Sequence, residues 1–231
     1  MPSHIYVQVG DWDGVVASNR RAWAASETWV ERRQLADSKK DFHALSWLHY
    51  GLLQQGDFEA ADEVRDILRA NGGGHHGSGP AWHARRLLES EDWSLKLPKD
   101  SMREEVRFAR AFAAARLGDL KTAREAAGDL SGSGRTEILR LQLEGLIAAR
   151  EGKSERAIDR LTRAADLEEG TRTPSGPPDL VKPALETLGE VALELGHCET
   201  AQDAFERSLA RMPGRRLSVR GIEAVGGCGY R

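Results

Sequence analysis

The sequence lacks the features of secreted and membrane-spanning proteins. Its 231 residues include only two cysteines, Cys198 and Cys228, which cannot build a disulfide framework. No apolar run approaches the roughly 18 residues that a membrane helix needs. The opening stretch MPSHIYVQVGDWDG has neither the basic start nor the long apolar core of a secretory signal. We therefore expect a protein of a reducing compartment, the cytoplasm, that does not bind a membrane.

An excess of charge of one sign is also missing. The chain has 33 Lys and Arg residues against 36 Asp and Glu residues, which gives a formal net charge of −3. Domains that bind nucleic acid usually carry a marked excess of positive charge. The charge balance therefore predicts a protein that does not bind nucleic acid.

The common signatures of catalysis are absent as well. The sequence has no G-x-S-x-G and no H-E-x-x-H motif, and its glycine-rich stretch at 71–80 is not followed by the lysine of a phosphate-binding loop. We expect no catalytic residue, no metal and no cofactor. One alternative stays open, a metal-dependent hydrolase in which His4 and His43, with Asp41 nearby, hold Zn²⁺.

A short pattern does recur along the chain. An apolar stretch ends in glycine, a bulky residue follows two positions later, and a small residue follows at five positions. The glycines are Gly10, Gly56, Gly118, Gly152 and Gly196, and a weaker copy has Glu91 at this position. The intervals scatter around 34 residues, the length of a tetratricopeptide repeat.

This pattern is typical of two helices joined by a tight turn. Glycine ends the first helix because it adopts a positive φ without a steric penalty. The small residue lets the second helix pack closely on the first. No stretch shows the sustained period-2 alternation of strands. The sequence therefore predicts an all-α protein, an α-solenoid of about five to six tetratricopeptide-like hairpins whose first hairpin is incomplete.

We expect one domain over residues 1–231. The predicted repeats lie near 1–28, 41–70, 80–98, 101–131, 135–169 and 180–213, with a possible capping helix at 215–225. The segments 71–80 and 168–179 are predicted loops because both are rich in glycine, and the second also in proline. Within the third repeat, the second helix is expected to be a short piece at 93–97.

Several stretches also resemble one group of proteins. MPSHIYVQVGDWDGVVASNRRA, DFHALSWLHYGLLQQGD, RAADLEEGTRTPSGPPDLVKPALETLGEVALELG and FERSLARMPGRR are similar to segments of uncharacterised bacterial tetratricopeptide proteins. The resemblance covers most of the chain and implies the repeat fold, without implying a reaction. Members of the group are longer at the N-terminus. We therefore expect this chain to be the C-terminal part of a longer protein, or its open first repeat to be covered by another chain.

In such arrays the first helix of each hairpin lines a concave groove that binds a segment of another protein. Counting back from each turn glycine places twelve residues in this groove: His4, Gln8, His43, Tyr50, Gln54, Arg85, Phe108, Phe112, Arg116, Gln142, Arg150 and Glu190. We expect the aromatic residues to anchor a partner and the arginines to orient it. The alternative for Phe108 and Phe112 is core packing, since aromatic residues at helical spacing are usually buried.

The predicted function is therefore a non-enzymatic scaffold that binds a protein or peptide. A homo-oligomer formed through the incomplete first repeat is the alternative within the binding class. For the cysteines, Cys198 takes the position of the bulky residue after a turn and is expected to be buried. Cys228 falls in a tail that is expected to be loose and to leave its thiol free.

Overall fold

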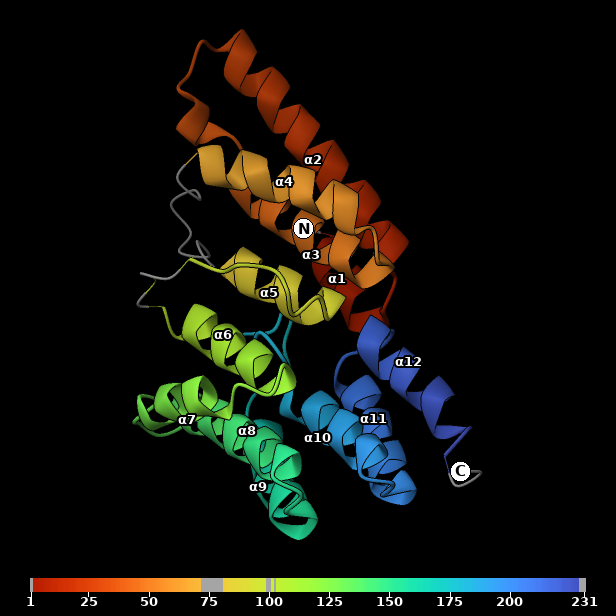
Figure 1. The fold of residues 1–231 in the computed structure, drawn as a ribbon. Coiled ribbons are helices and arrows are strands. Elements are labelled where there is room, and N and C mark those ends of the chain that lie inside the picture. The colour runs from red at the N-terminus through yellow and green to blue at the C-terminus, as the bar shows by residue number, and fades with distance from the viewer. Residues whose placement is uncertain (1, 72–80, 99–100, 102, 229–231) are drawn as a thin grey trace.

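A computed structural model describes residues 2–71, 81–98, 101 and 103–228, and over these residues the protein is all-helical (Figure 1). One short 3-10 helix, η1 (Asp37–Lys39), joins α2 and α3. The α-helices are α1 (Ser3–Val9), α2 (Trp12–Arg32), α3 (Phe42–Gln55), α4 (Phe58–Ala70), α5 (Ala81–Ser90), α6 (Glu104–Arg116), α7 (Leu120–Gly128), α8 (Arg135–Arg150), α9 (Ser154–Glu169), α10 (Ala184–Glu194), α11 (Cys198–Arg211) and α12 (Arg216–Val225). No helix among the described residues is both long and apolar enough to cross a bilayer.

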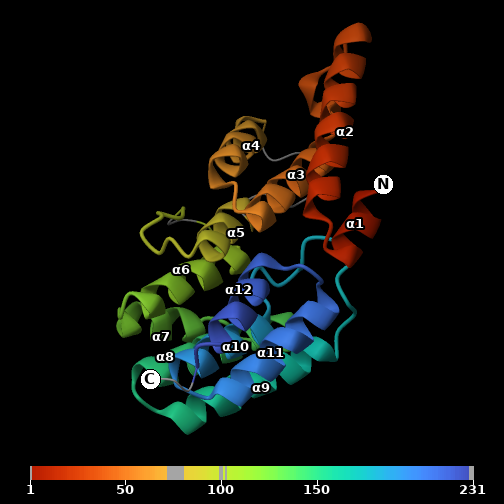
Figure 2. The ribbon, with the colours of Figure 1, turned by 90° about the vertical axis from the view of Figure 1, so that its right-hand side faces the viewer.

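The helices pack in the order of the chain, and alternate helices also stack on one another. Each helix contacts the next, and further contacts join α3 with α5, α6 with α8, α8 with α10, and α10 with α12. These helices form an inner row that is covered on one side by α4, α7, α9 and α11 (Figures 1 and 2). The largest core cluster follows this row from α5 to α10 and contains Phe108 and Phe112.

The turns between paired helices match the predicted turn chemistry. All five turn glycines have a left-handed backbone, with φ between +72° at Gly10 and +86° at Gly118. In the first, second and fourth copies the aspartate after the glycine caps the next helix, as Asp57 does by accepting from the backbone N–H of Ala60 (3.1 Å). Glu91 also has a positive φ, +57°, which confirms that this copy keeps the turn despite losing its glycine.

Two expectations about helix boundaries are wrong. Residues 93–97 form no helix but a turn that continues into extended chain, because Pro98 follows too soon for a helix to propagate. As a result α5 and α6 pack on each other directly in the inner row. In addition, α2 continues to Arg32, several residues beyond the predicted first repeat. The loop expected at 71–80 lies outside the described residues except for Asn71.

The two ends of the array contact each other. The indole N–H of Trp12, at the α1–α2 corner, donates to the carbonyl of Gly214 between α11 and α12 (2.6 Å). A Cβ on Gly10 would lie only 2.6 Å from the carbonyl oxygen of Pro213, so the two corners are in direct contact. The inner row therefore curves until its first and last hairpins meet, and its concave side is largely closed.

The segment between α9 and α10 fills much of this concave side. We call residues 171–183 the inner strap. It passes from α9 to α1, where Ser175 contacts His4 near the start of that helix, before it turns back into α10 (Figure 2). Leu180 and Val181 are part of the largest core cluster, and Lys182 and Pro183 are also buried. The part predicted as a loop, 171–179, is thus mostly exposed, whereas 180–183, predicted to open the last repeat, are buried and precede the helix.

The cysteines are paired, contrary to the expectation that Cys198 is buried alone and Cys228 free. A disulfide joins Cys198, the first residue of α11, to Cys228 beyond the end of α12. Both residues are half-buried. The bond ties the C-terminal helix to its neighbour, across a separation of 30 residues.

Reduction of this disulfide should destabilise the C-terminal part of the array. Closing a loop of 30 residues restricts the unfolded chain by about 3.6 kcal/mol, so the replacement Cys228→Ser should lower the free energy of unfolding by up to this amount. Urea titrations with and without dithiothreitol measure the effect. Dithiothreitol should lower the free energy of unfolding of the wild type and leave that of Cys228→Ser unchanged. A wild type indifferent to reductant would contradict the stabilising role.

Candidate functional site

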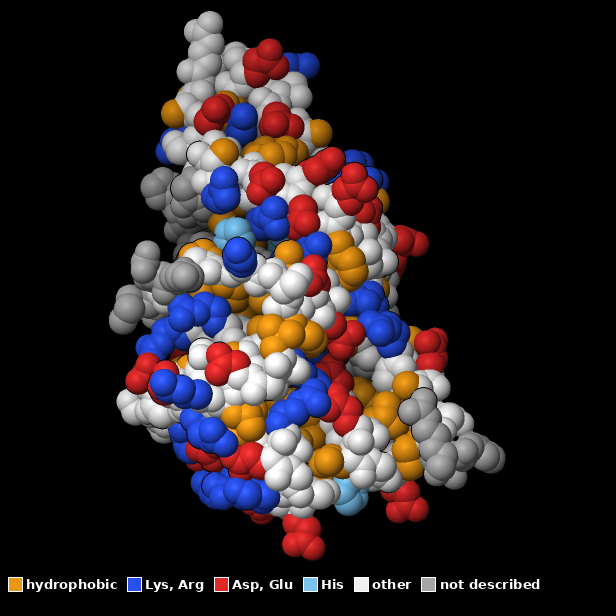
Figure 3. Space-filling view, viewed as in Figure 1, with side chains coloured by type: hydrophobic (Ala, Val, Ile, Leu, Met, Phe, Trp, Pro, Cys, Tyr) orange, Lys and Arg blue, Asp and Glu red, His pale blue; other side chains and the backbone are white. Residues whose placement is uncertain are grey.

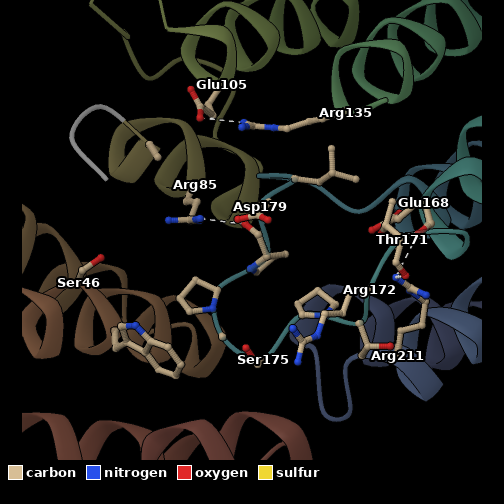
Figure 4. A pocket seen from close by; sticks show the side chains of 18 of the residues that line it. Ser46, Arg85, Glu105, Arg135, Glu168, Thr171, Arg172, Ser175, Asp179 and Arg211 are labelled. Atoms are coloured by element: carbon tan, nitrogen blue, oxygen red, sulfur yellow. Dashed lines mark hydrogen bonds and ion pairs between the residues drawn. The ribbon is translucent and has the colours of Figure 1, made fainter. Parts of the chain in front are cut away.

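A cavity of about 700 Å³ lies on the concave side beside the inner strap (Figure 4). Its walls come from helices that are far apart in the sequence. His43, Ser46 and Trp47 of α3 and Arg85 of α5 form one part, and the strap forms another. Further lining residues come from the start of α6, the start of α8 and the ends of α9 and α11. The cavity therefore exists only because the array is curved.

Hydrogen bonds to its backbone hold the strap in place. Arg85 donates through Nη2 to the carbonyl of Pro178 (2.9 Å), and the Nδ1–H of His4 donates to the carbonyl of Ser175 (3.1 Å). Between them, Gly176 lies against the indole of Trp47, where a Cβ would approach Cζ2 to 2.5 Å. Only glycine fits at this point, so the strap has one defined path along the cavity.

Arginine dominates the charged lining of the cavity. Arg135 of α8 forms an ion pair with Glu105 of α6 (2.8 Å), as Figure 4 shows. Arg211 at the end of α11 instead donates to main-chain carbonyls, those of Glu168 (3.2 Å), Glu169 (3.3 Å) and Thr171 (3.4 Å). The charged lining residues together are Arg85, Arg103, Arg135, Arg172 and Arg211 against Glu105, Glu168 and Asp179.

A second cluster of charges lies deeper, between the inner helices. Arg215 at the start of α12 is only 1% exposed. Its guanidinium donates to Glu186 (2.8 and 3.0 Å), to Glu89 (2.7 Å) and to the hydroxyl of Tyr50 (2.8 Å).

Figure 3, which shows one outer face, has small separate hydrophobic areas among charges of both signs.

The cluster continues from Glu186 towards the far end of α10. Lys182 of the strap pairs with Glu186 (3.4 Å) and Glu190 (2.5 Å). Glu190 pairs in turn with Arg116 of α6 (2.8 Å), and Arg116 also contacts Glu194. With the pair of Arg150 and Glu194 (3.5 Å) the cluster has four cations and four carboxylates, which we call the inner charge network: Glu89, Arg215, Glu186, Lys182, Glu190, Arg116, Glu194 and Arg150.

Electrostatics within this network favour the charged forms at its centre. Burial alone would raise the pKa of Glu186, but the charges of Arg215 and Lys182 outweigh it and lower the pKa to about 2. Burial raises the pKa of Tyr50 to about 12, so its hydroxyl stays protonated. Burial raises the pKa of Glu190, despite the charges of Lys182 and Arg116. Because the network has equal numbers of both charges, its members have partners within the protein.

The structure separates the twelve predicted groove residues into different places. His43 and Arg85 line the cavity. The inner charge network includes Arg116, Glu190 and Arg150, and the hydroxyl of Tyr50 accepts a hydrogen bond from its Arg215. Gln8 is exposed on α1, outside the residues that line the cavity.

The prediction that the remaining residues line an open groove is wrong. Phe108 and Phe112 are 0% exposed and pack on each other, which is the alternative of core packing. Gln142 is buried and donates to the carbonyl of Lys182 (3.3 Å), and Gln54 is buried and accepts from the backbone N–H of Arg216 (3.1 Å). The physical reason is closure, because the strap and α12 cover the face that an open array would present.

The two histidines of the metal hypothesis do come together. The rings of His4 and His43 are 6.4 Å apart, and both contact the indole of Trp47. Over residues 2–71, 81–98, 101 and 103–228, however, no group of three or more His, Cys, Asp or Glu residues could hold a metal ion. The Nδ1–H of His4 instead donates to the carbonyl of Ser175 in the inner strap.

Sequence analysis missed much of the cavity lining. It placed candidate residues only on the first helices of hairpins, whereas Arg103, Arg135, Glu168, Arg211 and residues 171–180 lie at helix ends or between helices. One available signal was the length of the 170–183 connection, because long connections inside a compact array are often functional.

Comparison with known proteins adds no assignment. No protein-family model, no curated protein and no solved structure matches the chain.

Proposed function

We propose that the protein is a tetratricopeptide-type α-solenoid that works as a non-enzymatic scaffold and binds a segment of another protein in the cavity beside the inner strap. The observation that carries this proposal is the cavity itself. It is about 700 Å³, it borders helices of the inner row, and a strap pinned by side chains fixes its shape. Preformed pockets of this size are typical of binding sites.

The repeat interpretation is supported by two independent features. The left-handed turn glycines recur with capping aspartates, and alternate helices stack into one row. Both features are typical of helix–turn–helix arrays, whose inner helices form the binding surface. Recognition in such a site needs shape and placed polar groups, and no bond is made or broken.

Blocking part of the cavity should weaken binding. Ser175 lines it with an exposed side chain, so Ser175→Trp should fill part of the site and leave the core unchanged. Gln202→Trp adds the same indole to an exposed position of α11 that does not line the cavity, and is the matched control. Peptides enriched from a random phage-displayed library would be tested by fluorescence anisotropy against all three proteins.

We expect Ser175→Trp to weaken these peptides at least about tenfold, a change of about 1.4 kcal/mol, and Gln202→Trp to bind like the wild type. Equal binding by both variants would exclude the cavity as the site. If no peptide is enriched and light scattering shows a stable dimer, self-association replaces this proposal.

A further inference from the structure

The charges that line the cavity do not balance. Five arginines face three carboxylates there, an excess of two positive charges in a chain whose formal net charge is −3. The inner charge network, by contrast, has four charges of each sign. Unbalanced positive charge is therefore a local property of the cavity.

Arg85 and Arg211 are bound differently from Arg135. Both donate to main-chain carbonyls, whereas Arg135 is matched by Glu105. Within the part of the chain that the structure describes, the buried Nε–H groups of Arg85 and Arg211 have no acceptor. Arg85 is 9% exposed, and burial lowers its pKa despite the opposing effects of Tyr50, Glu89, Glu105 and Asp179. Donors buried without acceptors are costly, and an anion that reached them would satisfy them.

Resting on the proposed function, we propose that the segment bound in this cavity is phosphorylated, and that its phosphoryl group binds among these arginines. A phosphoryl group carries a charge near −2 at neutral pH and three strong acceptor oxygens. It therefore matches both the two excess charges and the unused donors. Guanidinium groups bind phosphate through paired, charge-assisted hydrogen bonds. Arg172, exposed on the strap beside Arg211 in Figure 4, adds a cation at the entrance.

The first test compares two degenerate peptide libraries, one with a fixed central phosphoserine and one with serine at that position. The wild type should retain the phosphorylated library at least about tenfold better. Arg172→Gln, which changes an exposed side chain, and Arg85→Gln should each reduce this preference severalfold. Arg20→Gln, on an exposed position of α2 outside the cavity, should leave it unchanged. Equal retention of the two libraries, or a preference that survives both cavity variants, would overturn the proposal.

The second test needs no peptide ligand and separates the two proposals. O-phosphoserine and inorganic phosphate are titrated separately into ¹⁵N-labelled protein, and the arginine Nε–Hε signals are followed by NMR. We expect saturable shifts that include a signal missing from Arg85→Lys, a variant that keeps the charge. Such shifts without any peptide binding would retain the phosphoryl site and reject the scaffold function. Absence of shifts, with peptides that bind regardless of phosphorylation, would reject the phosphoryl site alone.

Discussion

Replacing Arg215 with methionine should destabilise the protein by about 3–5 kcal/mol, the usual cost of removing one partner from a buried ion pair. The guanidinium holds Glu186, Glu89 and Tyr50 together at 1% exposure. Without it the two carboxylates stay in a poorly solvated interior, and their repulsion and desolvation are no longer offset. Urea denaturation at pH 7, followed by circular dichroism, measures the loss.

Two further variants separate this effect from a general loss of charge. Arg220→Met changes an arginine of the same helix that pairs with Glu91 at the surface and is 57% exposed, so it should cost less than about 1 kcal/mol. Combining Arg215→Met with Glu186→Gln and Glu89→Gln should recover part of the stability, because fewer buried charges remain without a partner. A single variant as stable as Arg220→Met would show that the network contributes little.

Acid should destabilise the protein through His49 by about 2 kcal/mol between pH 6.5 and pH 4.5. The ring is fully buried in α3, and burial, with repulsion from Arg85, Arg65, His83 and Arg86, lowers its pKa from 6.5 to about 3. His49 therefore binds a proton near pH 6.5 in the unfolded chain, whereas it stays neutral at this pH in the folded chain. The stabilisation present above pH 6.5 is lost at up to about 1.4 kcal/mol per pH unit as the pH falls towards 3.

His49→Leu should remove this dependence. Among the described residues neither ring nitrogen of His49 has a hydrogen-bond partner, so the variant should be as stable as the wild type at pH 7 or more stable. The measurement is the difference in free energy of unfolding between variant and wild type from pH 7 to pH 4.5, which cancels the carboxylates common to both. Parallel curves for the two proteins would refute the role of His49.

The sequence predicted the helices and turns well because both are local. Turn glycines need no distant partner to adopt a positive φ, and α3 with α4 spans 42–70, in agreement with the repeat predicted at 41–70. Curvature is different, because it accumulates from small rotations at every interface along the array. The contact of Trp12 with Gly214 and the path of the strap depend on curvature, so no local pattern indicated them. The pairing of Cys198 with Cys228 depends instead on how α12 packs on α11.

The residues of the candidate site likewise divide into those that local patterns predict and those that distant contacts determine. His43 and Arg85 were predicted because they lie on inner helices, and their positions follow from helix periodicity. Tyr50 and Gln54 have the same periodicity but are buried under α12, which returns from the far end of the chain. Arg211 was not predicted, since it precedes a turn at the end of an outer helix.

The contact between the first and last hairpins has a consequence for folding. Where helical hairpins contact only their neighbours in sequence, a terminal hairpin can unfold while the others persist. Here Trp12 and Gly214, 202 residues apart in sequence, must meet before either corner is complete. Contacts between such distant residues slow folding, because a long chain must be closed before they form. Local unfolding of either end therefore destabilises the other end, and the protein should unfold cooperatively as a single unit.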